Sequence, residues 1–232
     1  MTILLSSDAL PRAGFDELRE AVQRRALGGL ELTVGAGQAH GVNPSLCPIL
    51  QNEHLSCVPG EAGVRWIQPS AECSLPMLVV WAGAASQIGA GLLLRRPEPD
   101  VPGTTAYIHG TDSDEAREAA RWAASRATFT SWEVAPSNYD PDLLDEVLAI
   151  TFPYLAHVRL LGGGPEPEEG VAGEVMMRLA LKGYTGTIAL APSSPKYEED
   201  WARWLLKKRG WGCGTAADKA ARRESIQVEE EA

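Results

Sequence analysis

The feature that most constrains the fold is a repeated order of apolar runs and helix-like stretches. From Thr104 onward, a short β-branched apolar run precedes a helix-like stretch four times. Each run is nearly continuous in apolar residues, as is typical of a parallel strand buried on both faces. Strands that alternate with helices of this length predict βα units and a parallel sheet. The predicted strands are 104–109, 128–135, 155–161 and 185–191, and the predicted helices are 112–127, 141–151, 171–182 and 196–209.

The first half of the chain fits the same order. Further strands are predicted at 2–6, 30–34, 64–68 and 91–94, with helices from Gly14 to Arg25 and over 75–88. The segment 96–103 contains three prolines and cannot form a full helix. The simplest architecture for eight strands is therefore a (β/α)8 TIM barrel whose fourth helix is shortened or replaced by a loop. A doubly wound open sheet is the alternative.

Composition limits the domain organisation and the partners. We expect one barrel domain over residues 1–214, followed by a charged helix or tail over 215–232. The net charge of −10 argues against nucleic acid, which favours a basic surface. No apolar run is long enough to span a bilayer, and the first residues do not resemble a signal peptide. We therefore expect a cytoplasmic protein that binds a small polar molecule and that could form a homo-oligomer.

Glu133 is the strongest single candidate for a functional residue. It interrupts the apolar strand Phe129–Pro136, and a carboxylate there has to be paired, metal-bound or directed into a polar cavity. In a barrel, sites lie at the carboxyl ends of the strands. An ion pair with Arg159 on the next strand and a role in a site are both consistent with this position, and both place Glu133 at the barrel mouth.

Three other candidates come from strand alternation. His157 and Arg159 share one face of the seventh predicted strand, where they could bind an anionic or hydroxylated ligand. A buried histidine beside a structural arginine is the alternative interpretation. Glu31 faces opposite to Leu30 and Leu32, so it is either a substrate-binding residue or part of a structural network.

The remaining candidates lie at the ends of strands or in loops. His109 ends the fifth predicted strand and could line the site, whereas Asp112 or Ser113 is expected to cap the following helix. His40 and Asn138 are candidates for substrate binding from loops, although a solvated surface cluster is the alternative for His40.

Several segments resemble the xylose isomerase-like sugar phosphate isomerase/epimerase barrels. Gly14–Ala21 followed by Leu27–Leu32 resembles the helix and "gvEl" strand that open these proteins. Leu155–Arg159 resembles their "i-x-H-v-H" strand, and Gly173–Ile188 resembles their closing "G-e … L-k-x-x-G-Y-x-G" stretch. The chain is thereby identified as a divergent member of this superfamily.

The resemblance implies a divalent metal (Mn, Zn or Co) at the barrel mouth, with Glu133, His109 and His157 as its ligands. It implies an isomerase or epimerase acting on or binding a carbohydrate-type ligand, with Glu133, His157 and Arg159 in catalysis. Two departures stand against a metal. Arg159 replaces the second histidine of the motif, and the eighth strand contains no acidic residue. The alternative is a metal-free, catalytically degenerate barrel that binds a small anionic ligand or a protein partner.

Overall fold

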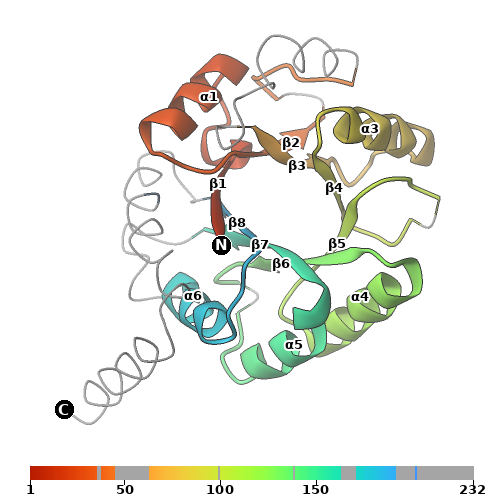
Figure 1. The fold of residues 1–232 in the computed structure, drawn as a ribbon, viewed down its shortest axis with the longest axis vertical. Helices are drawn as coiled ribbons and strands as arrows, with labels where there is room; N and C mark the ends of the chain where they lie inside the picture. The colour runs from red at the N-terminus through yellow and green to blue at the C-terminus, as the bar shows by residue number, and fades with distance from the viewer. Residues whose placement is uncertain are drawn as a thin grey trace.

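Eight parallel strands close into a single barrel in the order β1 to β8 (Figure 1). The structure is a computed structural model that describes residues 1–35, 38–44, 63–98, 100–137, 139–162, 171–191 and 202. The barrel is closed by pairing between β1 and β8, from Thr2 opposite Thr187 to Leu5 opposite Leu190. The strands are β1 (Thr2–Ser6), β2 (Leu30–Val34), β3 (Val64–Pro69), β4 (Gly91–Leu94), β5 (Thr105–His109), β6 (Phe129–Val134), β7 (Leu155–Leu161) and β8 (Thr187–Ala191).

The predicted (β/α)8 class is confirmed, and every strand begins and ends within two residues of its predicted bounds. Helices surround the barrel (Figure 1). They are α1 (Phe15–Arg24), α3 (Leu75–Gln87), α4 (Ser113–Arg126), α5 (Leu144–Thr151) and α6 (Val171–Leu181), with short 3-10 helices η1 (Ser7–Ala9) and η2 (Phe152–Tyr154).

Two details of the helices bear on the predictions. Between β4 and β5, the described residues 95–98 and 100–104 contain no helix, as the prolines predicted. Helix α5 begins at Leu144 and not at 141, because Asp140 accepts a hydrogen bond from the Asp142 amide (2.9 Å) and holds a turn there. The helix predicted at 196–209, apart from Ala202, and the tail 215–232 lie outside the described residues.

Strand alternation divides the interior into two layers. Outward-facing residues such as Leu32, Val134 and Leu160 pack with helix residues in one large apolar cluster. Inward-facing residues fill the lumen with a much smaller apolar cluster. This lumen cluster contains Leu4, Trp66, Leu93, Ala106, Ile108 and Ala189. The described lumen also contains buried polar side chains, and these hold the candidate site.

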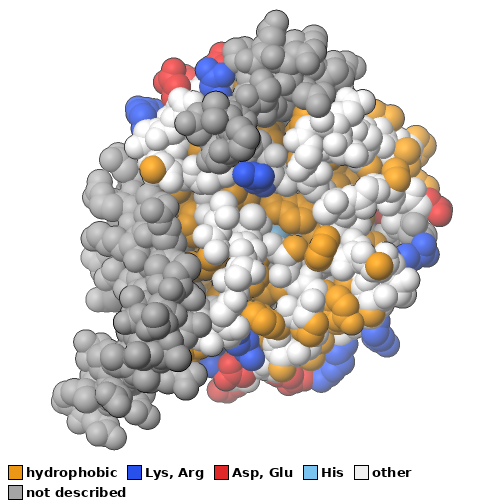
Figure 2. All heavy atoms as spheres, viewed as in Figure 1, with side chains coloured by type: hydrophobic (Ala, Val, Ile, Leu, Met, Phe, Trp, Pro, Cys, Tyr) orange, Lys and Arg blue, Asp and Glu red, His pale blue; other side chains and the backbone are white. Residues whose placement is uncertain are grey.

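Helix α3 differs from the other described α-helices because it contains no charged residue. Leu75, Met77, Val79 and Val80 on this helix are exposed. Figure 2 shows hydrophobic side chains gathered over this helix, at the upper right of the view. Among the helices that the structure describes, none combines the length and the apolar character needed to cross a membrane. The homo-oligomer that the sequence analysis allowed for stays a prediction.

Candidate functional site

Charged side chains from five separate segments meet in the lumen, toward the carboxyl ends of the strands. Glu31 comes from β2, Glu133 from β6 and Arg159 from β7. Asp8 lies in η1, directly after β1, and Arg95 directly follows β4. Glu133 and Arg159 are opposite each other in the ladder between β6 and β7. We call these five residues, together with His157, the charged network.

Two irregularities in the sheet lie next to this network. Between β2 and β3 the register shifts at Glu31, so that Arg65 is an extra residue in β3. Between β6 and β7 it shifts at Ser131, and Ala156 is the extra residue. Such bulges redirect the side chains that follow them. They therefore help to set the positions of the inward-facing carboxylates and of their partners.

Arg159 is the centre of the charged network and is only 1% exposed. Its Nε donates to Glu31 Oε1 (2.9 Å) and its Nη2 to Asp8 Oδ2 (3.0 Å), while its Nη1 donates to Glu133. Burial alone would lower the pKa of Arg159, but the charge and hydrogen bonds of Glu31 outweigh it and raise that pKa. Arg159 is therefore a permanent cation held by three carboxylates.

Glu31 is fully buried and accepts hydrogen bonds at both oxygens. Oε1 accepts from Ser6 Oγ (2.8 Å) and from Arg159, and Oε2 lies 2.7 Å from His157 Nε2. Burial would raise the pKa of Glu31, but the Arg159 charge and the His157 hydrogen bond lower it to about 2. Glu31 is thus an ionised carboxylate without access to solvent, and it is unsuited to act as a general base on a ligand.

His157 is held at both ring nitrogens. Nε2 faces the Glu31 carboxylate, which can only accept, so this nitrogen carries the proton. Nδ1 lies 2.7 Å from Thr187 Oγ1, which also accepts from Trp66 Nε1 (2.9 Å) and lies 3.2 Å from the Ala156 carbonyl. Burial lowers the pKa of His157, and the Glu31 contacts oppose this only in part. The lowered pKa favours the neutral ring, in which Nδ1 and the Ala156 carbonyl are the two acceptors within reach of the single Thr187 hydroxyl proton.

The outer part of the charged network is partly open. Arg95 forms a two-pronged ion pair with Glu133, from Nη1 to Oε1 (3.1 Å) and from Nη2 to Oε2 (2.9 Å). The side chains of Arg95, Glu133 and Asp8 are 39%, 15% and 37% exposed. Asp8 also accepts from Thr33 Oγ1 (2.9 Å). The network therefore has a closed inner part (Glu31, His157, Arg159) and an open outer part (Asp8, Arg95, Glu133).

The three metal ligands that the resemblance implied are not brought together. On β5, Ala106 and Ile108 belong to the lumen cluster, whereas Tyr107 packs against Trp122 of α4. Alternation places His109 on the outer face with Tyr107. Among the described residues, no group of three or more His, Cys, Asp or Glu side chains could hold a metal ion.

The donor set of the charged network does not fit a divalent cation either. Arg159 lies among the carboxylates of Asp8, Glu31 and Glu133, so a second cation there would meet its positive charge. The ring nitrogens of His157 are already engaged by Glu31 and Thr187. Metal coordination would require these contacts to be broken.

The other predicted residues have structural partners. His109 donates from Nδ1 to the Gly110 carbonyl (2.8 Å). Burial, opposed by this bond, lowers the pKa of His109 to about 4. Asp112 caps α4, as predicted, by accepting from the amides of Asp114 (2.8 Å) and Glu115 (3.0 Å).

His40 lies outside the charged network. Its Nδ1 accepts from the Val42 amide (3.1 Å), so its Nε2 donates to the Thr33 carbonyl (2.9 Å). His40 thus fastens the chain that follows β2 to the end of that strand. The predicted residue Asn138 lies outside the described residues.

Sequence reasoning missed Asp8 and Arg95. Both come directly after strands that were predicted correctly, at the carboxyl ends where a barrel site lies. Both lie within two residues of the end of a predicted strand, so the strand-end position that marked His109 applies to them as well.

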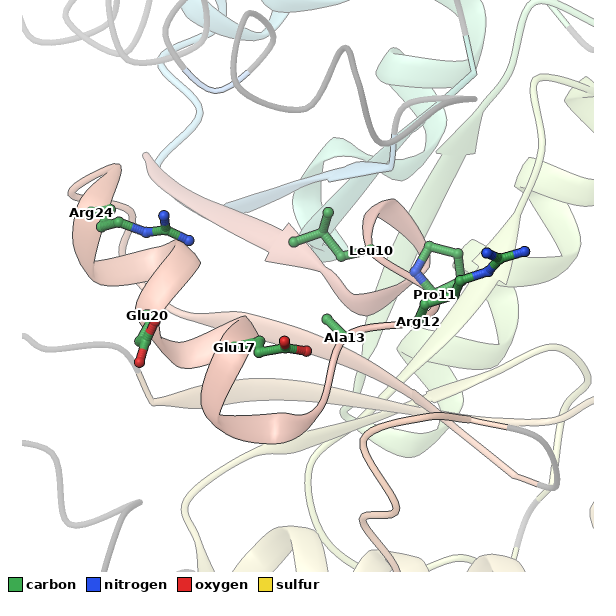
Figure 3. Close-up of a pocket in the computed structure, with 7 residues that line it drawn as sticks. All are labelled: Leu10, Pro11, Arg12, Ala13, Glu17, Glu20 and Arg24. Carbon is green, nitrogen blue, oxygen red and sulfur yellow. The ribbon is translucent and has the colours of Figure 1, made fainter.

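Two cavities contain no member of the charged network in their lining. A groove of about 770 Å³ lies between the segment that precedes α1 (Leu10, Pro11, Arg12 and Ala13) and the face of α1 that carries Glu17, Glu20 and Arg24, as Figure 3 shows. Its charged residues, Arg12, Glu17, Glu20 and Arg24, are exposed. A second cavity, of about 430 Å³, lies at the amino ends of the strands, where Trp66, Gly91 and Thr187 contribute to its lining.

The comparisons with known proteins support the fold. No family model matches the chain, and no curated protein matches it in sequence. Among solved structures, 3-keto-D-glucoside 4-epimerase from E. coli superposes with a TM-score of 0.62 at 12% identity, covering 89% of this chain and 99% of the epimerase. D-psicose 3-epimerase from Clostridium cellulolyticum gives 0.60 at 11% identity, with coverage of 91% and 99%. A xylose isomerase domain protein from Salmonella typhimurium gives 0.52 at 12% identity, with coverage of 92% and 97%.

At these identities the likeness shows the fold alone. The chain shares its closed (β/α)8 barrel fold with these three proteins. The chemistry has to be argued from the charged network itself.

Proposed function

We propose that this protein is a metal-free barrel that binds a small, hydroxyl-rich ligand of the carbohydrate type at its carboxyl-end mouth. One observation carries the proposal: a fully buried ionic core holds an outer part that is partly open, at the end of the barrel where ligands bind. Carboxylate and guanidinium groups in fixed positions offer adjacent acceptors and donors, which suit neighbouring hydroxyl groups.

Stability alone is a poor explanation for such a network. A buried ion pair contributes little net stability, because the cost of removing its charges from water offsets their attraction. Arg159 and Glu31 are both almost completely buried, whereas Arg95 and Asp8 reach solvent. The inner part therefore acts as a support that fixes the position of the outer side chains.

Sugar isomerisation or epimerisation is the second candidate. It is favoured by Glu133, a carboxylate at the mouth with 15% of its side chain exposed, and by the sugar epimerases among the similar structures. Such a reaction needs a group that can remove and return a proton. Glu31 and His157 are enclosed by their partners, so this role would fall to one of the two carboxylates of the outer part, Glu133 or Asp8.

Thermal unfolding with a panel of aldoses, ketoses and their phosphate esters tests ligand binding. A ligand at a hundred times its dissociation constant stabilises the native state by about 2.7 kcal/mol. We expect Arg95→Gln and Glu133→Gln to lose this stabilisation. Arg117→Gln is the matched control, because Arg117 pairs with Asp114 and Glu146 on the outer helices and should leave binding unchanged.

Two outcomes would overturn the proposal. One is that no member of the panel shifts the unfolding temperature of the wild-type protein. The other is that a chelator abolishes binding and added manganese, cobalt or zinc restores it, which would contradict the metal-free assignment. Epimerisation is tested separately by uptake of solvent deuterium into a bound sugar. That uptake should disappear in Glu133→Gln if the carboxylate moves the proton.

A further inference from the structure

Gln68 is a buried polar side chain of the lumen with an unused acceptor. It lies two residues after Trp66 on β3, and alternation places it on the same inward face. The residue is 4% exposed, and its Oε1 has no hydrogen-bond partner among the described residues. A buried amide oxygen without a donor costs free energy, so it indicates a bound water or ligand that donates to it.

Asp8 provides a second acceptor on the other side of β2. Its Oδ2 accepts from Thr33 Oγ1 and from Arg159 Nη2, but no described residue donates to its Oδ1. Thr33 is opposite Gln68 in the ladder between β2 and β3. The two acceptors therefore lie on either side of Thr33, with Asp8 after the carboxyl end of β1 and Gln68 near that of β3.

A third unpaired group lies deeper in the lumen. Ser131 of β6 is completely buried and opposite His157, and its hydroxyl has no partner in the described part of the chain. A hydroxyl group can donate as well as accept. The Ser131 hydroxyl can therefore pair with a water, or with a ligand hydroxyl that acts as donor or as acceptor.

The cations of the charged network are already committed. Arg159 donates to all three carboxylates, and both terminal nitrogens of Arg95 donate to Glu133. The network contains three carboxylates (Asp8, Glu31, Glu133) and two guanidinium groups (Arg95, Arg159), which leaves one excess negative charge when His157 is neutral. A phosphate ester, with about 1.5 to 2 negative charges, would be repelled there.

We infer that the ligand is an uncharged sugar or polyol and not a sugar phosphate, with its hydroxyl groups donating to Gln68 Oε1 and Asp8 Oδ1. This inference rests on the proposed function and names the ligand class of the same site. It narrows the sequence-based expectation, which included sugar phosphates and small anions.

The experiment compares an uncharged ketose or aldose with its own phosphate ester by titration calorimetry of the full chain. D-fructose with D-fructose 6-phosphate, and D-glucose with D-glucose 6-phosphate, are the first pairs. We expect the uncharged member of a binding pair to bind at least about tenfold more tightly, a difference of about 1.4 kcal/mol. Its affinity should not change with ionic strength, because no net charge is involved.

Variants locate the contact. Gln68→Leu should weaken binding of the uncharged sugar about tenfold or more, because it removes the acceptor. Gln68→Glu, which keeps an acceptor in the same place, should retain most of the binding. Arg117→Gln should leave both affinities unchanged. A Gln68→Leu protein that binds as tightly as wild type would overturn the assigned contact.

The outcomes separate this inference from the proposed function. Tighter binding of the uncharged sugar supports both. Equal or tighter binding of the phosphate ester overturns the inference but leaves a carbohydrate site at the mouth. Binding of inorganic phosphate alone at comparable strength also overturns it. If neither member of any pair binds, the proposed function is wrong and the inference falls with it.

Discussion

The two layers of this barrel are built from the same strands but follow opposite chemical rules. The outer layer, between strands and helices, is a continuous apolar core that includes Leu32, Leu148 and Val175. The described lumen has a small apolar cluster, next to buried charges that are joined by hydrogen bonds. On a strand such as β2, adjacent residues point to opposite faces, so a leucine that packs on a helix lies next in sequence to the lumen carboxylate Glu31.

The difference shows where stability and specificity arise. Apolar burial in the outer layer favours folding at about 25 cal/mol per Å² and tolerates exchange of one apolar residue for another. The lumen gains little net stability from its ion pairs. Loss of any one partner is nevertheless costly, because it leaves a buried charge without an opposite charge beside it. We therefore expect the lumen to be sensitive to polarity and the outer layer to be sensitive to volume.

The largest effect is expected from Arg159→Met in the lumen. It leaves Glu31 buried without its main cation, which should cost about 3–5 kcal/mol in the free energy of unfolding. Urea denaturation measures this loss. Arg159→Met combined with Glu31→Gln should recover part of it, because the buried charge is gone. A loss below about 1 kcal/mol, as for an exposed pair such as that of Arg117, would mean that the lumen charges are hydrated.

The next effect tests the outer layer. Leu148 of α5 is completely buried, and Leu148→Ala should cost about 2–5 kcal/mol through lost contacts and the cavity that remains. Ligand affinity, measured by calorimetry, should not change. Arg95→Gln should show the opposite pattern, with affinity lost and stability nearly kept. If Leu148→Ala weakened binding as strongly as Arg95→Gln, the division between the two layers would fail.

The smallest effect distinguishes His109 from Glu31 by pH. In the outer layer, the pKa of His109 lies at about 4, below its ordinary 6.5, so between these values the unfolded chain binds a proton that the native protein does not. Stability should therefore fall as the pH drops below 6.5, by about 2 kcal/mol at pH 5 from His109. His40 and His157, whose pKa values are also lowered, add to this loss.

Glu31 in the lumen acts in a lower pH range. Its pKa is lowered from 4.5 to about 2, so its contribution is present above 4.5 and is lost as the pH falls toward 2. Urea titrations at a series of pH values should show that His109→Gln flattens the upper range and Glu31→Gln the lower one. A single acid transition that neither variant alters would refute both assignments.

The fold could be predicted because its signals are local. A run such as Leu155–Leu161 is apolar over its whole length, and Gly162 and the helix after it complete a βα unit. Eight predicted strands, six of them followed by a predicted helix, favour a barrel. Alternation also predicted correctly that His157 and Arg159 share one face, and the residues at the start of α4 predicted the Asp112 cap.

The site could be predicted only in part. Glu133 and Arg159 are an ion pair, as one of the two interpretations had it, because they lie on strands that are adjacent in sequence. The pairing of Asp8 with Arg159 joins residues 151 positions apart, and that of Glu31 with His157 joins residues 126 apart. No local pattern records such pairings.

The sequence by itself determined the order of strands and helices and favoured a closed barrel over an open sheet, because these follow from short-range periodicity and turn chemistry. The tertiary structure alone decided which inward-facing charges meet. Closure brings β1 and β2 beside β7 and β8, and the register shifts at Glu31 and Ser131 set the level at which each side chain enters the lumen. Those contacts depend on the geometry of the whole barrel. Two charges attract strongly only at a separation of a few ångströms, and only the complete sheet brings these side chains that close together.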